Sequence, residues 1–311
     1  MNRRSFIKNT GIDSLGLGLK IDKTYSNNSL SNFPIVIATW DVKNATKRAW
    51  EILSSGGNSL DAVELGCRVE EANKEGQSVG IGGLPDREGN VTLDACIMDY
   101  YGNCGSVVYL KEIKHAISVA RMVMEKTPHV MLAGEGAKKF AISMGFKKEN
   151  LLTEKSKKDW IKWKENEEYK PIINIENHDT IGMLAIDKDQ NISGGCTTSG
   201  LAYKMQGRVG DSPIIGSGTW AQNNVCGVSS TGHGEFFIKY QVAREVCVRI
   251  EYLNQNLSDS AESIINELKE LGASGGLISI DHKGNISAPF NTKGMIRGSQ
   301  TNKTNLVSKI Y

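Results

Sequence analysis

The chain has 311 residues, 39% of them hydrophobic, with 33 glycines, 6 prolines and a formal net charge of +2. This length and composition predict a compact globular protein rich in tight turns, built as one large domain or two small ones. The small net charge argues against a nucleic-acid partner, since no basic stripe alternates with aromatic residues, and no apolar run is long enough to span a bilayer.

The first 33 residues have the pattern of an exported segment rather than of a fold element. Residues 2–8 resemble a twin-arginine export signal, with Arg3 and Arg4 at its centre. The apolar stretch that follows is short and interrupted by Asp13, and residues 20–33 are rich in asparagine and serine, as in a spacer. We expect residues 1–33 to be an export signal or disordered tail of a periplasmic protein. The alternative is a disordered tail on a cytoplasmic protein.

From residue 34 to the middle of the chain, the hydrophobic pattern predicts strands and helices in alternation. Buried strands are expected at residues 34–39, 91–98 and 104–110. Helices are expected at residues 45–54, from a cap at Asn58 onward, around residues 117–124 and at residues 137–144. The densely charged residues 147–170 mix both signs, which favours a solvated helix or a linker.

After residue 180 the pattern shifts toward sheet. Two β-hairpins are predicted, the first from residues 181–187 and 192–197 and the second from residues 277–281 and 286–290. Helices are predicted between them at residues 235–254 and 259–271. Two hairpins around two consecutive helices favour an α+β protein with helices packed outside its sheets over a strictly alternating parallel sheet.

Neither cysteines nor glycines indicate a bound group. The chain has six cysteines, at positions 67, 96, 104, 196, 226 and 247. They show no CxxC pair and no metal-ligand spacing, so we expect small buried hydrophobes rather than a disulfide framework or a zinc site. The glycine-rich residues 80–83 lack the strand–turn–helix context of a phosphate-binding loop. We therefore expect no metal and no cofactor.

The segment from His178 to Met183 carries the clearest chemical signal, because Asp179-Thr180 lies where the charged linker meets an apolar strand. A threonine hydroxyl is a weak nucleophile unless a base lies beside it. Cleavage just before the threonine frees an α-amine that serves as this base. Asp179 offers the carbonyl that the Thr180 hydroxyl attacks and a carboxylate to assist. The free α-amine makes His178 redundant as a base. By itself an Asp-Thr pair is not specific, since such pairs commonly cap helices and turns.

Several further motifs follow one another in a fixed order. They are Gly-Gly-Asn-Ser-Leu-Asp-Ala-Val (56–63), Ser-Val-Gly-Ile-Gly-Gly-Leu-Pro-Asp (78–86), Thr-Leu-Asp-Ala (92–95), Glu-Lys-Thr-Pro-His (125–129), Gly-Arg-Val-Gly-Asp-Ser-Pro-Ile (207–214) and Thr-Gly-His-Gly (231–234). Together with residues 178–183 they resemble the glycosylasparaginases of the N-terminal-nucleophile hydrolase superfamily, from about residue 34 to residue 231. The resemblance implies a four-layer αββα sandwich made as one precursor and cleaved before Thr180. It also implies an α chain of residues 34–179, a β chain of residues 180–311, and assembly as (αβ)2.

The implied substrate is a small asparagine-like molecule whose side-chain amide is hydrolysed through an ester on Thr180. Its α-carboxylate matches the planar fork of Arg208, and its α-ammonium matches Asp211. An ion pair that merely braces the loop is the alternative for Arg208 and Asp211. The Thr231 hydroxyl and the Gly232 N–H are expected to form the oxyanion hole, against the alternative of a plain glycine turn.

Three further residues complete the predicted site. Thr198 lies on the partner strand of the first hairpin and is expected to hydrogen-bond Thr180, unless it is only a cross-strand threonine. Ser78 precedes a glycine-rich turn and is expected to hold Thr180 or the substrate, with a simple turn serine as the alternative. Trp40 is expected to form a wall of the pocket, or else to be a core aromatic residue.

Two departures from the family pattern bear on the leaving group. Glycosylasparaginases commonly have an aromatic residue two positions after the tryptophan, where this chain has Val42. Residues 275–278, 281–284 and 289–295 resemble the plant-type asparaginases and isoaspartyl peptidases more closely.

The leading hypothesis is hydrolysis of N4-(β-N-acetylglucosaminyl)-L-asparagine to aspartate. The first alternative is an L-asparaginase or isoaspartyl dipeptidase with the same mechanism. The remote alternative is an uncleaved, inactive protein that binds amino acids or glycopeptides.

Overall fold

The computed structural model describes residues 32–40, 43–165 and 180–311, and Ser31–Tyr311 form one compact unit. One sheet has eight strands in the order β12-β11-β1-β5-β6-β2-β3-β4, and the other has four in the order β10-β9-β8-β7. The strands are β1 (Ile35–Thr39), β2 (Leu93–Met98), β3 (Cys104–Leu110), β4 (Met131–Ala133), β5 (Thr180–Ile186), β6 (Ile192–Thr198), β7 (Thr219–Gln222), β8 (Cys226–Gly232), β9 (Gly275–Asp281), β10 (Ile286–Ser287), β11 (Arg297–Thr301) and β12 (Thr304–Lys309). The helices are α1 (Lys43–Ser54), α2 (Ser59–Glu71), α3 (Ala116–Lys126), α4 (Gly134–Ser143), α5 (Glu154–Glu165), α6 (Gly234–Tyr240), α7 (Val242–Leu253) and α8 (Leu257–Glu270).

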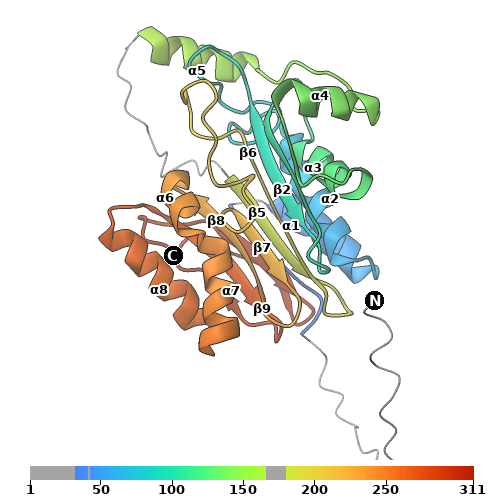
Figure 1. Ribbon diagram of the computed structural model, residues 1–311, viewed down its shortest axis with the longest axis vertical. Coiled ribbons are helices and arrows are strands. Elements are labelled where there is room, and N and C mark those ends of the chain that lie inside the picture. Colours follow the sequence, from blue (N-terminus) through green and yellow to red (C-terminus); the bar gives the residue numbers. More distant parts are fainter. Residues whose placement is uncertain (1–31, 41–42, 166–179) are drawn as a thin grey trace, which may run out of the picture. The chain divides into compact units, whose positions relative to one another are not determined.

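The elements stack in four layers, helices–sheet–sheet–helices (Figure 1). Helices α1, α2 and α3 cover the outer face of the eight-stranded sheet, and α7 and α8 cover the outer face of the four-stranded sheet. Three apolar clusters lie between the layers: one under α1–α3, one under α7 and α8, and one between the sheets. The predicted α+β fold, with helices outside a four-layer αββα sandwich, is confirmed.

The same five-residue turn, which begins with an aspartate and ends with an asparagine, closes the hairpins β2–β3, β5–β6 and β9–β10 and occurs a fourth time in the loop before β2. In each turn one carboxylate oxygen of the aspartate accepts hydrogen bonds from the N–H groups two and four residues later. The fourth position has a positive φ between 65° and 86°, which suits glycine. The turns begin at Asp86, Asp99, Asp187 and Asp281. In the three hairpins, a short polar motif thus sets the register of the paired strands.

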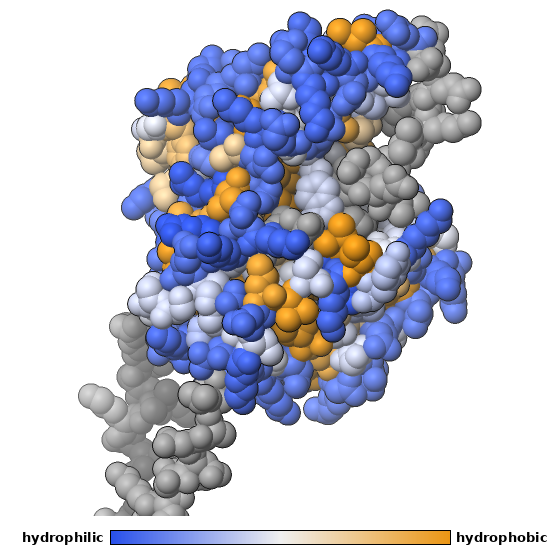
Figure 2. Space-filling view, turned by 180° about the vertical axis from the view of Figure 1, so that it is seen from behind, coloured by the Kyte–Doolittle hydropathy of each residue, from blue (hydrophilic) through white to orange (hydrophobic). Residues whose placement is uncertain are grey.

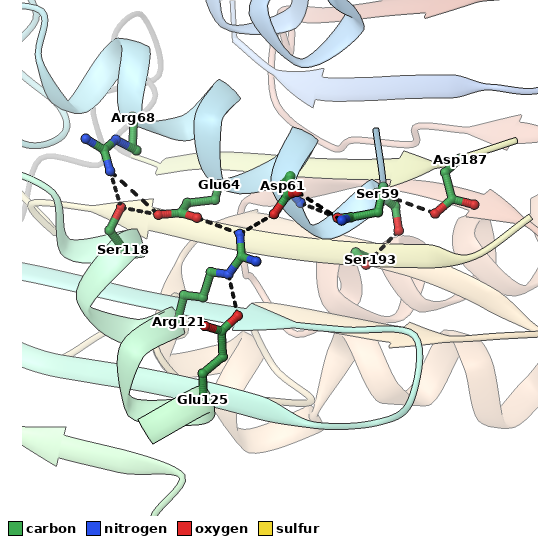
Figure 3. Close-up of polar contacts among 10 residues, drawn as sticks. Ser59, Asp61, Glu64, Arg68, Ser118, Arg121, Glu125, Asp187 and Ser193 are labelled. Atoms are coloured by element: carbon green, nitrogen blue, oxygen red, sulfur yellow. Dashed lines mark hydrogen bonds and ion pairs between the residues drawn. The ribbon is translucent and has the colours of Figure 1, made fainter. Parts of the chain in front are cut away.

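The turn between β5 and β6 is anchored to the helical layer by a polar network (Figure 3). The Ser59 N–H donates to Asp187 at 3.1 Å, and the hydroxyls of Ser59 and Ser193 lie 2.8 Å apart. Further along α2, Arg121 of α3 pairs with Asp61 at 2.6 Å and with Glu64 at 2.7 Å, and its Nε donates to Glu125 at 2.6 Å. Burial opposes the charge of Arg121, but the hydrogen bonds that it donates to these three carboxylates raise its pKa above the ordinary value.

The structure corrects the sequence-based expectations at several places. The helix predicted over residues 235–254 is two helices, α6 and α7, because Gln241 between them adopts a left-handed conformation with φ 49°. The second predicted hairpin is shorter, since β10 contains only Ile286 and Ser287. Strands β4, β7, β8, β11 and β12 were not predicted.

The prediction for the cysteines was wrong in one respect. Cys226 of β8 and Cys247 of α7 form a disulfide that joins the four-stranded sheet to its helical layer. The free cysteines behave as expected, because Cys67, Cys96 and Cys196 are buried and only Cys104 is partly exposed.

The surface is mostly polar. Figure 2 shows hydrophilic residues over most of the face it presents, with hydrophobic residues in small separate groups. Within residues 32–40, 43–165 and 180–311, no helix combines the length and apolar character needed to cross a bilayer.

Candidate active site

Thr180 is the first residue of β5, and it faces the space between the two sheets. Side chains alternate along a strand, and Leu184 and Ile186 belong to the apolar cluster between the sheets. Ile181 and Met183 point the other way, into the cluster under the helices. Thr180 is only 6% exposed. The predicted nucleophile therefore lies inside the sandwich.

Thr198 lies directly across the ladder from Thr180, as the sequence predicted for the partner strand. In the next pair of strands Thr198 lies across from Asp94 of β2. Residues that oppose each other across an antiparallel ladder place their side chains on the same face. Asp94, Thr198 and Thr180 thus form one row of polar side chains, which we call the nucleophile row. The Thr198 hydroxyl accepts a hydrogen bond from the Gly200 N–H at 2.9 Å.

Two hydroxyl residues that the sequence reasoning missed lie beside Thr180. The Thr39 hydroxyl donates to the carbonyl oxygen of Thr180 at 3.1 Å and accepts from the Gly182 N–H at 2.8 Å, so it fixes the first residues of β5. The Ser212 hydroxyl lies 3.4 Å from that of Thr180. Both residues adjoin positions that were predicted, Trp40 and Asp211, and this proximity in sequence was the available signal.

Thr231 is brought toward Thr180 by the packing of β8 on β5. A Cβ on Gly182 would collide with the Ser229 hydroxyl, and a Cβ on Gly227 would lie 3.4 Å from the Leu184 side chain. Moving forward along β5 from Gly182 to Leu184 therefore corresponds to moving back along β8 from Ser229 to Gly227. From this correspondence we infer that Thr231 lies at the same end of the two sheets as Thr180.

Gly232 follows with φ 140°, and a Cβ there would lie 2.5 Å from the Ser274 carbonyl oxygen. Only glycine fits this close approach of β8 to β9. The roles of Thr231 and Gly232 as oxyanion hole remain predictions.

Arg208 is oriented by a residue that the sequence reasoning missed. Its Nε and Nη2 donate to the two carboxylate oxygens of Glu235 at 2.9 and 3.0 Å, a bidentate pair. The alternative of an Arg208–Asp211 ion pair bracing the loop does not describe this geometry, because the fork of Arg208 is held by Glu235. Glu235 directly follows the motif 231–234 that was singled out in the sequence.

Asp211 is a buried carboxyl group with an unused acceptor. It is 4% exposed, and within the described part of the chain its Oδ2 has no hydrogen-bond partner. Its other oxygen, Oδ1, lies 2.8 Å from the position that a Cβ on Gly234 would occupy. Burial raises the pKa of Asp211 to about 7, although the charge of Arg208 acts in the opposite direction. This carboxyl group is suited to bind a cationic group.

The remaining predicted residues lie at the margins of this arrangement. Ser78 is buried, and its carbonyl oxygen accepts from the N–H and the hydroxyl of Ser199 at 2.8 and 2.9 Å. Trp40 directly follows β1 with φ 81° and packs, partly buried, against the cluster under the helices. Asp179 and Val42 lie outside the described residues. None of the roles predicted for these residues is tested by this geometry.

Metal ligands do not gather at the site. In the described ranges, no group of three or more histidine, cysteine, aspartate or glutamate side chains is placed to hold a metal ion. The site offers hydroxyl groups, the carboxyl groups of Asp94, Asp211 and Glu235, and the guanidinium of Arg208.

A family model described as asparaginase matches residues 22–308. The chain belongs to the asparaginase family. It is 48% identical over 304 residues to an N(4)-(β-N-acetylglucosaminyl)-L-asparaginase of Elizabethkingia miricola, a match that covers 92% of this chain and 88% of that protein. These matches confirm the family resemblance seen in the sequence.

Two branches of the family are represented among the relatives. An N(4)-(β-N-acetylglucosaminyl)-L-asparaginase of Rattus norvegicus is 41% identical over 238 residues, covering 67% of this chain and 69% of that protein. An isoaspartyl peptidase of Salmonella typhimurium is 37% identical over 263 residues, covering 79% of this chain and 82% of that protein. The two branches correspond to the leading hypothesis and to its first alternative.

Proposed function

We propose that the protein is an autoproteolytically activated amidohydrolase that cleaves the side-chain amide of N4-(β-N-acetylglucosaminyl)-L-asparagine and releases aspartate. The observation that carries the proposal is the buried position of Thr180 at the start of β5, where it lies across the ladder from Thr198 and its hydroxyl is 3.4 Å from that of Ser212, the neighbour in sequence of the buried Asp211. The 48% identity to a relative of that name supports the leaving group.

The reaction begins with activation of the precursor. The Thr180 hydroxyl attacks the carbonyl carbon of Asp179, and the C–N bond between Asp179 and Thr180 breaks, which leaves an ester on the hydroxyl oxygen and frees the α-amine of Thr180. Water then hydrolyses the ester, which releases the Asp179 carboxylate and restores the Thr180 hydroxyl. This amine then takes the hydroxyl proton while the oxygen attacks the substrate's side-chain carbonyl. Thr39 holds the Thr180 carbonyl throughout, which fixes the backbone beside the new amine.

Substrate hydrolysis then proceeds in two steps. The Thr231 hydroxyl and the Gly232 N–H stabilise the negative oxygen of the first tetrahedral intermediate. The C–N bond breaks, the leaving amine takes the proton from the α-amine, and an aspartyl ester remains on Thr180. Water attacks this ester with the α-amine as base and regenerates the hydroxyl. Arg208 and Asp211 hold the α-carboxylate and α-ammonium through both steps.

The experiment that tests the proposal compares three substrates on one preparation: glycosylasparagine, asparagine and a β-aspartyl dipeptide. We expect glycosylasparagine to have the highest kcat/KM. Selective blocking of the α-amine of the fragment that begins at Thr180 should abolish turnover of all three. Substantial activity after blocking would contradict the α-amine as base.

An L-asparaginase or isoaspartyl dipeptidase is the second candidate, with the same nucleophile and a different leaving group. It is favoured by the 37% identity to an isoaspartyl peptidase and by the matching segments between residues 275 and 295. A higher kcat/KM for asparagine or the β-aspartyl dipeptide than for glycosylasparagine would decide in its favour.

We also propose that the protein is exported to the periplasm, degrades glycoprotein fragments there and assembles as (αβ)2. The twin-arginine-like residues Arg3 and Arg4 support export, and the Cys226–Cys247 disulfide suits an oxidising compartment. Replacing both arginines by lysine should leave the protein in the cytoplasm, and sedimentation should give about twice the mass of one chain. Unchanged export or a monomeric mass would contradict these two points.

A further inference from the structure

Lys204 carries a buried ammonium group that the proposed reaction does not use. Its side chain is 1% exposed, and its Nζ lies 3.6 Å from Oδ2 of Asp94, whose side chain is 0% exposed. Neither of these two atoms has a hydrogen-bond partner in the part of the chain that is described. Burial lowers the pKa of Lys204, while Asp94 acts to raise it. A buried pair of this kind contributes little to stability, because desolvation of both charges opposes their attraction.

Lys204 and Asp94 belong to different parts of the candidate site. Asp94 belongs to the nucleophile row with Thr198 and Thr180. Lys204 belongs to residues 199–211, which leave β6 directly after Thr198 and carry Arg208 and Asp211. We call this segment the binding loop. The Lys204–Asp94 pair therefore ties the binding loop to the row that contains the nucleophile.

The surroundings hold both charges in place. Gly200 has φ 78°, and a Cβ on it would lie 2.6 Å from the Lys204 Nζ, so the ammonium group occupies space that only glycine leaves free. The Lys204 carbonyl accepts from the Arg87 N–H at 3.1 Å. On the other side, Oδ1 of Asp94 accepts from the Tyr109 N–H at 2.8 Å.

The preceding residue gives the loop a second anchor. The Tyr203 N–H donates to the Pro85 carbonyl at 2.9 Å, and its ring stacks on Trp163 of α5, with centroids 4.6 Å apart. Tyr203 also has a left-handed backbone with φ 56°, which is unfavourable for a bulky side chain unless the surroundings impose it. The middle of the binding loop is thus clamped in one conformation.

We propose that Lys204, through its ion pair with Asp94, is a positioning residue that sets the distance between the nucleophile row and the Arg208 and Asp211 side chains. The inference rests on the proposed function, in which these two residues hold the α-carboxylate and the α-ammonium of the substrate. Loss of the pair then weakens recognition of those two groups and spares the chemistry at Thr180.

The test uses the double variant Lys204→Met/Asp94→Asn, since removal of one partner alone leaves an uncompensated buried charge. Removing both charges is close to neutral for folding, and self-cleavage should proceed. We expect KM for glycosylasparagine to rise roughly 10- to 100-fold while kcat changes by less than about threefold, as for loss of uniform binding. Against a substrate analogue that lacks the α-amino group, the variant and the parent should differ much less.

A matched control is Lys114→Met/Glu149→Gln, which removes a partly exposed ion pair with a 3.1 Å separation. This variant should keep the KM and kcat of the parent. If the double variant at the site is not soluble, Asp94→Glu keeps both charges, lengthens one side chain by a methylene and should raise KM several-fold. If either site variant keeps the KM of the parent, or loses only kcat, the inference is overturned. Absence of turnover in the parent itself would instead overturn the proposed function.

Discussion

The two ends of the β5–β6 hairpin differ in how their polar groups are satisfied. At the turn end, Ser59 hydrogen-bonds to both Asp187 and Ser193, and further along α2 Arg121 binds its three carboxylates (Figure 3). At the other end, Asp94, Lys204 and Asp211 each keep a buried polar atom without a hydrogen bond among the described residues.

The difference separates a structural from a functional use of polar groups. A fully satisfied network fixes one arrangement, and here it fixes the register that places Thr198 across from Thr180. Lys204 and Asp94 form an ion pair with each other, whereas Oδ2 of Asp211 accepts no hydrogen bond among the described residues, a costly state that suits this end to a charged ligand. The first three predictions perturb the nucleophile end, and the fourth perturbs the turn end.

The largest effect is expected for Thr180→Ala, which removes the nucleophile of both proposed steps. The variant should remain one uncleaved chain on a denaturing gel and should show no hydrolysis of any aspartyl substrate. Its thermal unfolding should stay close to that of the parent, because the hairpin register is set at the turn end. Cleavage of this variant would show that another group performs the attack.

The next effect is expected for Arg208→Lys, which replaces a planar fork by a point charge. Lysine cannot satisfy Glu235 bidentately and also take a carboxylate edge-on, so the loss in kcat/KM should be about 2–4 kcal/mol for every substrate with a free α-carboxylate. Self-cleavage should survive, because Asp179 and Thr180 provide its reacting groups. Kinetics measure the loss in kcat/KM, and a denaturing gel measures self-cleavage. A variant that no longer cleaves itself, or one with normal kinetics and lower stability, would favour a structural role for Arg208.

A smaller effect is expected for Asp211→Asn, and it depends on pH. The pKa of Asp211 is raised from its ordinary value near 3.8 to about 7 by burial, with Glu235 and Asp94 adding to the shift and Arg208 opposing it. Between these two values the folded protein holds a proton that the unfolded chain releases, so the contribution of Asp211 to stability falls as pH rises through this window. The variant should therefore be more stable than the parent at pH 8, by roughly 1–3 kcal/mol, and equal to it below pH 4.

The same titration governs substrate binding. Below about pH 7 the carboxyl group is neutral and pairs poorly with an ammonium group, so kcat/KM of the parent should fall as pH decreases through this value. Urea unfolding and pH–rate profiles measure the two consequences separately. Equal stability of parent and variant at pH 8 would show that Asp211 is not desolvated in the free protein.

The smallest effect on catalysis is expected at the turn end. Arg121→Met leaves Asp61, Glu64 and Glu125 without their common cation, and the free energy of unfolding should fall by about 1–2 kcal/mol, because the side chain is 18% exposed and the pair is partly screened. The kinetic constants should not change. Arg48→Met, at an exposed pair with Glu51, is the control and should change stability by less than about 0.5 kcal/mol. A raised KM in Arg121→Met would erase the distinction between the two ends.

The sequence predicted those parts of the fold that depend on local patterns. Strand β1, helices α1–α4 and α8, and the β5–β6 hairpin follow hydrophobic periodicity, caps and turn residues close to them in the chain. Strands β7 and β8 were missed because their serines, threonines and glycines are polar or small, and they become strand residues only by packing between two layers. The disulfide joins residues 21 positions apart and depends on how α7 lies against β8.

The candidate site divides in the same way. Thr180, Arg208, Asp211, Thr231 and Gly232 stand in recognisable motifs, whereas Thr39, Lys204 and Glu235 act through partners distant in the chain. Thr39 meets Thr180 across 141 positions and Lys204 meets Asp94 across two strands, and no local pattern records such contacts. Glu235 could have been predicted from the sequence, since it adjoins the motif at residues 231–234.

The measurement that tests the central claim most directly is denaturing mass spectrometry of the purified protein, before and immediately after a short incubation with glycosylasparagine quenched in acid. The account predicts two fragments, the smaller beginning at Thr180, and after incubation an added aspartyl group on that fragment alone. A fully active protein that remains a single chain, a fragment that begins at another residue, or an aspartyl group on the other fragment would contradict it.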